Sequence, residues 1–350
     1  MPVRIFGAPP RYLQGAGALA QLAPLFAEFG RRPFIIADAA AGEGLRQEVE
    51  QRLKDTTDRV IFGVAGARCT AAEIERFAET ARMLEADLVT GFGGAVALGI
   101  AKGVALAIRL PLVTVPTVPC CHAPVSRLVE IEGEGEGEAI ETRLLPAPPE
   151  AVLVDTVQLA SAPSRLFIAG LGDALARRFE LEHAAGALNP LGGRPALLAL
   201  AAADTAYRLI REHAIAALAQ RTRRSGGDAL EAVAEAMLLL SGIAHESGGP
   251  GVAHALARSL AALPACRTAL HGELVAFALL AQLVLEERPG DLLADLVGFY
   301  RSLGLPARLH EIGIVAEAEA AAETAARRGL PTDAKRLARA ILTADALATG

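Results

Sequence analysis

One aspartate and two histidines in the second half of the chain could hold a metal ion. They are Asp173, His254 and His271. One carboxylate and two imidazoles satisfy part of the coordination shell of a divalent cation and leave a position open, as catalytic metal sites do. A histidine taken alone is more often a surface or core residue, so this interpretation depends on the motifs around each of the three.

A glycine-rich turn in the first half of the chain could hold a phosphate group. Gly91-Phe92-Gly93-Gly94 follows an expected strand and precedes an expected helix. Glycines let a phosphate approach the backbone, and the N-terminus of a helix favours an anion. Asp38 ends an earlier expected strand, where a carboxylate can hold the two hydroxyls of a ribose. The turn does not match the G-x-G-x-x-G pattern, so a simple strand-to-helix turn stays an alternative.

Alternating strands and helices must position the glycine turn. The sequence predicts strands at residues 32–38, 60–64, 87–91, 111–115 and 151–155, and helices at 42–53, 71–85 and through 102–108. This repeated βαβ pattern predicts a parallel sheet with helices on its faces.

The second half of the chain is expected to be helical. After Ser161 the pattern stays helical almost to the end, with breaks near residues 189–190, 225–227, 248–251 and 289–290. We therefore predict an α/β plus all-α fold: a Rossmann-like parallel-sheet domain at 1–161 and an all-helical domain at 162–350. Ligands of such proteins usually bind in the cleft between the domains, at the carboxyl ends of the strands, so we expect the active site there.

Composition excludes several classes of protein. The chain has 350 residues, 52% hydrophobic and 21% charged, so it is too apolar for disorder and long enough for two domains. A net charge of −6, 4% aromatic residues and no tryptophan argue against nucleic acid as a partner.

We expect a cytoplasmic protein with no membrane partner. The sequence has no apolar run of membrane-spanning length and no apolar signal-peptide core at its start. Its four cysteines are few, and two are adjacent, which favours a reducing compartment. They are Cys69, Cys120, Cys121 and Cys266.

Motifs spread along most of the chain carry a family resemblance. They are Pro10-Arg11-Tyr12-Leu13-Gln14-Gly15, Val154-Asp155-Thr156, Gly170-Leu171-Gly172-Asp173-Ala174-Leu175-Ala176, Leu240-Ser241-Gly242, Glu246-Ser247-Gly248-Gly249, Ala253-His254-Ala255, His271-Gly272-Glu273 and Gln282-Leu283-Val284-Leu285-Glu286. With these motifs the chain resembles the glycerol dehydrogenase branch of the iron-containing, metal-dependent group III alcohol dehydrogenases.

The resemblance implies a metal-dependent NAD(H) oxidoreductase. In that family the aspartate and the two histidines that match Asp173, His254 and His271 bind a catalytic zinc or iron ion. The metal lowers the pKa of a substrate hydroxyl, and the resulting alkoxide passes hydride to a nicotinamide. The resemblance also implies a homo-oligomer, between a dimer and an octamer. Asp38 would repel a 2′-phosphate, which favours NAD over NADP.

The dinucleotide loop departs from the family pattern, which reads GGGK and then L-D-T-A-K. Gly93 and Gly94 match, whereas Ala95 replaces the third glycine and Val96 replaces the lysine. Loss of a charge-assisted phosphate contact is expected to weaken binding by about 1.5–3 kcal/mol. The expected cofactor-binding residues are Asp38, Gly93, Gly94, Ala95, Thr117 and Cys120.

A second departure lies in Pro116–Pro124. Cys120 and Cys121 replace a serine and a threonine of the family, and His122 replaces an aspartate near the substrate and nicotinamide. We expect an altered substrate pocket in which His122 is a catalytic residue that carries a proton or donates a hydrogen bond. A Cys120–His122 dyad is an alternative, because the two share one face of an extended segment. His245 replaces an aromatic residue and lies either in the cleft or at the surface.

These features favour oxidation or reduction of a small polyol, hydroxyketone or related alcohol. The altered segments leave two alternatives open. One is a metal-dependent lyase or cyclase resembling dehydroquinate synthase, with no net redox turnover, and the other is a non-catalytic member of the family.

Overall fold

The computed structural model describes most of the chain, in two compact units. The described residues are 3–39, 42–119, 122–133, 140–184, 188–189, 192–223, 226–249, 251–315, 318–329 and 333–347. The sheet unit contains residues 6–162 and 217–246, and the helical unit contains 1–5, 163–216 and 247–350. Both units are discontinuous in sequence, and the division into domains at residues 161 and 162 stays a prediction.

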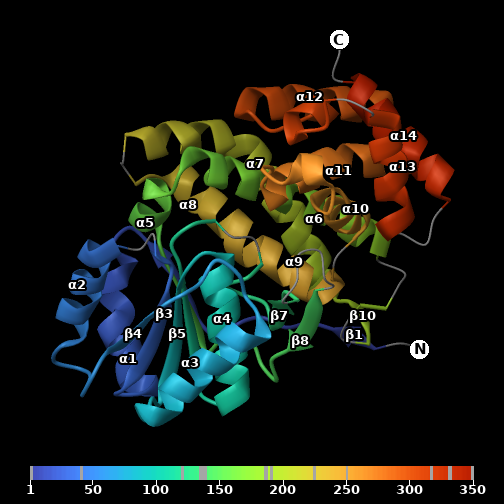
Figure 1. Ribbon diagram of the computed structural model, residues 1–350. Coiled ribbons are helices and arrows are strands. Elements are labelled where there is room, and N and C mark those ends of the chain that lie inside the picture. The colour runs from blue at the N-terminus through green and yellow to red at the C-terminus, as the bar shows by residue number, and fades with distance from the viewer. Residues whose placement is uncertain are drawn as a thin grey trace. The chain divides into compact units, whose positions relative to one another are not determined.

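A six-stranded parallel sheet forms the centre of the sheet unit (Figure 1). Its strand order is β2 (Tyr12–Gly15), β9 (Ala151–Asp155), β6 (Leu112–Pro116), β5 (Leu88–Gly93), β3 (Pro33–Ala37) and β4 (Ile61–Val64). The five strands predicted from apolar runs are present. Strand β2 was not predicted, and it pairs with β9 in the register Tyr12 to Val152.

Apolar residues on the two faces of the sheet hold its helices. On β3, Ile35 packs in one core with α1 (Leu22–Phe29) and α2 (Gly42–Leu53). Its neighbours Phe34 and Ile36 pack in the other core, with α3 (Ala71–Met83) and α4 (Ala95–Ile108). This alternation follows from the two-residue period of a strand. The sheet unit also contains α5 (Thr156–Ser161), the antiparallel pair β7 (Leu128–Ile131) and β8 (Glu141–Leu144), and α8 (Asp228–Glu235).

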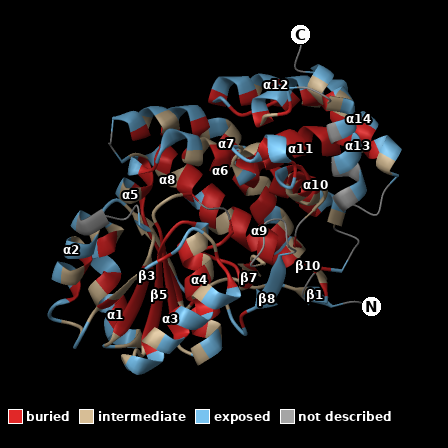
Figure 2. Ribbon diagram, in the orientation of Figure 1, coloured by how far each residue is buried: buried red, intermediate tan, exposed pale blue. Residues whose placement is uncertain are grey.

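Buried helices form the core of the helical unit. The long helix α6 (Ser164–Ala184) packs against α11 (His271–Leu285), which is buried along most of its length (Figure 2). Around α11 lie α10 (Val252–Ala261) and α14 (Ala334–Leu347). The unit also contains α12 (Gly290–Leu303), α13 (Ala318–Gly329), and parts of α7 (Leu197–Thr222) and α9 (Ser241–Gly248). A short parallel pair, β1 (Arg4–Ile5) with β10 (Arg194–Pro195), adds strand to a region expected to be wholly helical.

Among the described residues, no helix has the combination of length and apolar character needed to cross a membrane.

Candidate metal centre and nucleotide site

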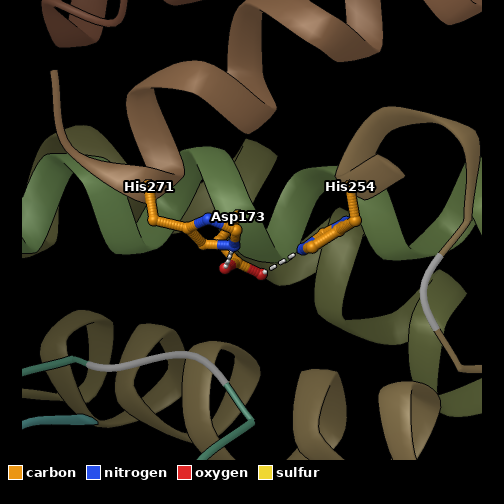
Figure 3. A group of neighbouring side chains, drawn as sticks. All are labelled: Asp173, His254 and His271. Atoms are coloured by element: carbon orange, nitrogen blue, oxygen red, sulfur yellow. Dashed lines mark hydrogen bonds and ion pairs between the residues drawn. The ribbon is translucent and has the colours of Figure 1, made fainter. Parts of the chain in front are cut away.

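Asp173, His254 and His271 converge from three helices of the helical unit (Figure 3). Asp173 lies in the middle of α6, His254 in the first turn of α10, and His271 is the first residue of α11. Their candidate ligand atoms all lie within 4.8 Å of one another. The Asp173 carboxylate is 3.3 Å from Nε2 of His254 and 3.5 Å from Nε2 of His271. The side chain of His271 is 48% exposed, so the group is accessible from one side.

Close approach of α11 to α6 places His271 beside Asp173. The backbones meet at Gly272, where a Cβ atom would lie 1.9 Å from the carbonyl oxygen of Ala169. Only glycine permits this approach, because the obstacle is backbone rather than a movable side chain. The helix–helix contact therefore fixes the position of the neighbouring histidine.

Glu180 fixes the ring of His254. Its Oε1 accepts a hydrogen bond from the backbone N–H of His254 at 2.9 Å, and its Oε2 lies 2.8 Å from the ring Nδ1. When Nδ1–H donates to Glu180, a neutral ring directs the lone pair of Nε2 toward Asp173. A carboxylate that orients a histidine in this way is the usual outer partner of a metal-binding imidazole.

Arg177 contacts both Asp173 and His254. This residue was not among those predicted from the sequence. Its Nη2 is 3.1 Å from Oδ1 of Asp173 and 2.5 Å from Nε2 of His254, and its side chain is 2% exposed. A guanidinium can only donate, so the second contact is a hydrogen bond only when the His254 ring is neutral at Nε2. Arg177 and Glu180 follow Asp173 by four and seven residues on one helix. That spacing places all three on one face, which is a signal available in the sequence.

Charge stabilises the ionised carboxylates of this cluster. Burial raises the pKa of Asp173, but Arg177 and His254 outweigh burial and hold that pKa well below its ordinary value. Burial likewise raises the pKa of Glu180, and His254 and Arg177 bring it below the ordinary value. Burial and Arg177 lower the pKa of His254, whereas Glu180 and Asp173 raise it by more. The two buried carboxylates therefore favour positive charge beside them, either as a proton on His254 or as a bound cation. Two nitrogen donors and one oxygen donor fit a divalent transition-metal ion.

Predicted cofactor residues meet at the carboxyl ends of the strands. Oδ2 of Asp38, which follows β3, accepts a hydrogen bond from the backbone N–H of Gly94 at 2.5 Å. Gly93 ends β5, and its carbonyl oxygen accepts a hydrogen bond from the N–H of Thr117 at 3.1 Å. Strand β4, which follows β3 in the sequence, lies on one side of β3 in the sheet, and the next strand, β5, lies on its other side. Such a point of reversal is where nucleotides bind in open parallel sheets.

A pocket of about 300 Å³ adjoins Asp38 in the sheet unit. Its walls include Leu45, Val49, Phe62 and Phe92, with the edge strand β4 on one side. An apolar recess beside a carboxylate can take a planar base and the ribose attached to it. Ala95 begins α4 directly after the glycine turn, whereas Cys120 and Cys121 lie outside the described residues.

His122 and His245 stack on each other in the sheet unit. Their ring centroids are 3.7 Å apart with an angle of 15° between the planes, and both side chains are buried. Nδ1 of His122 lies 3.0 Å from Oγ of Ser126. The buried Lys102 of α4 donates to the carbonyl oxygen of Leu128 at 2.9 Å, so it joins α4 to β7. The structure places His245 in the interior rather than at the surface.

The sequence and the structure of this chain are both similar to those of known alcohol dehydrogenases. The sequence model of iron-containing alcohol dehydrogenase matches residues 9–156. The glycerol dehydrogenase of Thermotoga maritima is 37% identical over 87% of this chain and 84% of its own length. The chain belongs to the iron-containing alcohol dehydrogenase family.

Another relative, a glycolaldehyde reductase of Halobacterium salinarum, is 33% identical over 89% of this chain and 85% of its own length. The crystal structure of a probable glycerol dehydrogenase from Sinorhizobium meliloti superposes with a TM-score of 0.91, at 30% identity and 99% coverage of both chains.

Family membership confirms the predicted class of enzyme. This iron-containing alcohol dehydrogenase is a metal-dependent oxidoreductase, and its relatives do not favour the lyase, cyclase or non-catalytic alternatives. The fold class predicted from the sequence is confirmed as well, since the parallel-sheet region and the helix-rich region recur in the family's solved structures.

Proposed function

We propose that this family member interconverts small polyols and the corresponding hydroxyketones or hydroxyaldehydes with NAD(H). The observation that carries the proposal is the convergence of Asp173, His254 and His271 from three separate helices. The names of the relatives, glycerol dehydrogenase and glycolaldehyde reductase, support a small hydroxylated substrate. One carboxylate and two imidazoles would hold Zn²⁺ or Fe²⁺.

Each residue near the metal centre has a separate proposed task. A bound divalent ion would act as a Lewis acid that makes a substrate hydroxyl easier to deprotonate. Asp173 would supply the anionic ligand. Glu180 would accept a hydrogen bond from Nδ1–H of His254, so that the lone pair of Nε2 remains available to the metal ion. The exposed side of His271 leaves room for a small substrate to reach the group.

The nucleotide is proposed to bind at the carboxyl ends of β3 and β5. Asp38 would hold the ribose, with the adenine in the apolar pocket beside it. The pyrophosphate would lie along Gly93, Gly94 and Ala95, and Thr117 and Cys120 are the other proposed cofactor-binding residues. A carboxylate at the ribose disfavours NADP, so we propose NAD as the cofactor. From the family resemblance we also infer a homo-oligomer, between a dimer and an octamer, and from the few cysteines a cytoplasmic location.

The metal requirement tests the proposed function directly. Protein loaded with Zn²⁺ or Fe²⁺ is expected to reduce NAD⁺ with glycerol or another small diol and to bind NADH saturably in a fluorescence titration. Dialysis against a chelator should remove the turnover, and only the functional ion should restore it. NADH binding without any turnover on a panel of small alcohols and ketones would contradict the redox assignment, and no NADH binding at millimolar concentration would end it.

His122 is proposed to carry a proton or donate a hydrogen bond to the substrate. We expect His122→Asn to lower kcat by about 100-fold, the scale of general acid–base catalysis, while the Kd for NADH stays the same. Steady-state kinetics and NADH titration would separate the two effects. His213→Asn, at a partly exposed histidine of α7, is the matched control. Unchanged kcat in His122→Asn would remove His122 from the reaction.

A further inference from the structure

We propose that Arg177 competes with the metal ion for Asp173 and His254, so that its guanidinium sets the metal affinity of the centre. The inference rests on the proposed function, because it takes Asp173, His254 and His271 as the ligands of the ion.

One cationic group contacts two of the three candidate ligand atoms. Nη2 of Arg177 is 3.1 Å from Oδ1 of Asp173 and 2.5 Å from Nε2 of His254. A neutral imidazole has a single lone pair, on the nitrogen that carries no proton. When that lone pair accepts from Arg177 it cannot coordinate a metal ion. The two arrangements therefore exclude each other at His254.

The charges of the buried cluster also set a divalent cation and Arg177 against each other, because the two carboxylates with Arg177 alone keep one unbalanced negative charge. The Asp173 and Glu180 carboxylates are buried together with Arg177, and both contact its guanidinium. A divalent cation alone neutralises the two carboxylates, whereas the cation together with Arg177 leaves an excess positive charge in a low-dielectric interior. Such an excess is strongly unfavourable, because like charges repel over these distances with little screening.

Glu180 provides a second partner for the guanidinium. Its Oε2 lies 3.4 Å from Nη1 of Arg177, whereas the contact with Asp173 is made by Nη2. Arg177 can therefore withdraw from Asp173 and His254 and keep a carboxylate beside it. The metal-free protein is stabilised by Arg177, and metal binding must displace that contact. The consequence is a weaker metal affinity than the three ligands alone would give.

The test compares variants that remove a charge inside and outside the cluster. Arg177→Met keeps most of the side-chain volume without the guanidinium, and Arg177→Gln is a second neutral variant. The matched control is Arg178→Met, because Arg178 is one-third exposed and pairs with Glu182 and Asp204 instead of the ligands. Full-length, metal-stripped proteins are titrated with Zn²⁺ against a chromophoric chelator, and circular dichroism establishes that each variant is folded.

We expect Arg177→Met to bind Zn²⁺ at least about tenfold more tightly than the unaltered protein, and Arg178→Met to differ by less than about twofold. Thermal melting gives a second readout that does not depend on activity. Without metal, Arg177→Met should melt at a lower temperature than the unaltered protein, and with Zn²⁺ it should melt at least as high. If Arg177→Met does not fold without metal, Arg177→Gln decides the comparison.

The outcomes separate this inference from the proposed metal centre. If the unaltered protein binds Zn²⁺ and the Arg177 variants bind it equally or more weakly, the competition is disproved and the metal centre stands. If the Arg177 variants bind Zn²⁺ and the unaltered protein does not, the competition is supported, and Arg177 then prevents metal binding altogether. If none of the proteins binds Zn²⁺ or Fe²⁺, the metal centre of the proposed function fails, and the competition fails with it.

Discussion

Asp173→Asn is expected to abolish NAD-linked alcohol oxidation and to weaken metal binding by more than about 100-fold, since loss of an outer partner alone costs about 10- to 100-fold. The substitution removes the proposed anionic ligand and keeps the shape of the side chain. The pKa of Asp173 lies well below its ordinary value, so the native residue is ionised throughout the neutral range and the variant loses a full charge. Metal titration and kcat/KM measure the two effects.

Asp204→Asn is the matched control for this variant. Asp204 pairs with Arg178 and Arg208 at the surface of the helical unit, and its side chain is 46% exposed. We expect its metal affinity and kcat/KM to equal those of the unaltered protein. Because Asp173→Asn also leaves Arg177 with less compensating charge, its thermal melt must be recorded. A folded Asp173→Asn protein with normal metal content and kcat/KM would exclude Asp173 from the centre.

Gly272→Ala is expected to destabilise the protein by at least about 3 kcal/mol, the upper part of the range for overpacked interiors. The new methyl group would lie 1.9 Å from the carbonyl oxygen of Ala169, so α6 and α11 must separate. Separation moves His271 away from Asp173, so metal affinity should fall with stability. The midpoint of urea unfolding and a metal titration record the two losses.

Gly298→Ala tests the same substitution where space is free. Gly298 lies inside α12, and beyond its own helix backbone and chain neighbours no atom lies within 4 Å of the place that a Cβ would take. Alanine is favoured over glycine inside a helix by about 0.8–1 kcal/mol, so this variant should be slightly more stable. Equal unfolding midpoints for Gly272→Ala and the unaltered protein would mean that the two helices tolerate a wider separation.

Local patterns were sufficient to predict most of the sheet unit. Apolar runs located five of the six strands. The pattern Thr70-Ala71-Ala72-Glu73 is that of a capping box, and the Thr70 hydroxyl lies 3.3 Å from the N–H of Glu73 at the start of α3. Strand β2 could not be predicted from an apolar run, because Tyr12–Gly15 is short and contains the polar Gln14. Its pairing partner is β9, far along the chain, so no local pattern identifies it.

The candidate site is harder to predict, because its parts come from distant segments. His254 is 81 residues from Asp173, and periodicity within a helix says nothing about a contact over that interval. Only the resemblance of the surrounding motifs grouped the two with His271. By contrast, Arg177 and Glu180 lie on the same helix as Asp173, and helical spacing alone could have associated them. The stacking of His122 on His245 had no comparable signal.

The three candidate ligands differ in exposure, so water would reach a bound ion from the side of His271. Asp173 and His254 are buried, and Glu180 holds His254, whereas His271 is half exposed and stands at the first position of its helix. Water would therefore reach the imidazole of His271 in the proposed centre without opening the protein interior. In the proposed centre, release of a bound ion would start at His271, so this residue would set how long the ion stays, and the buried pair would set whether it binds at all.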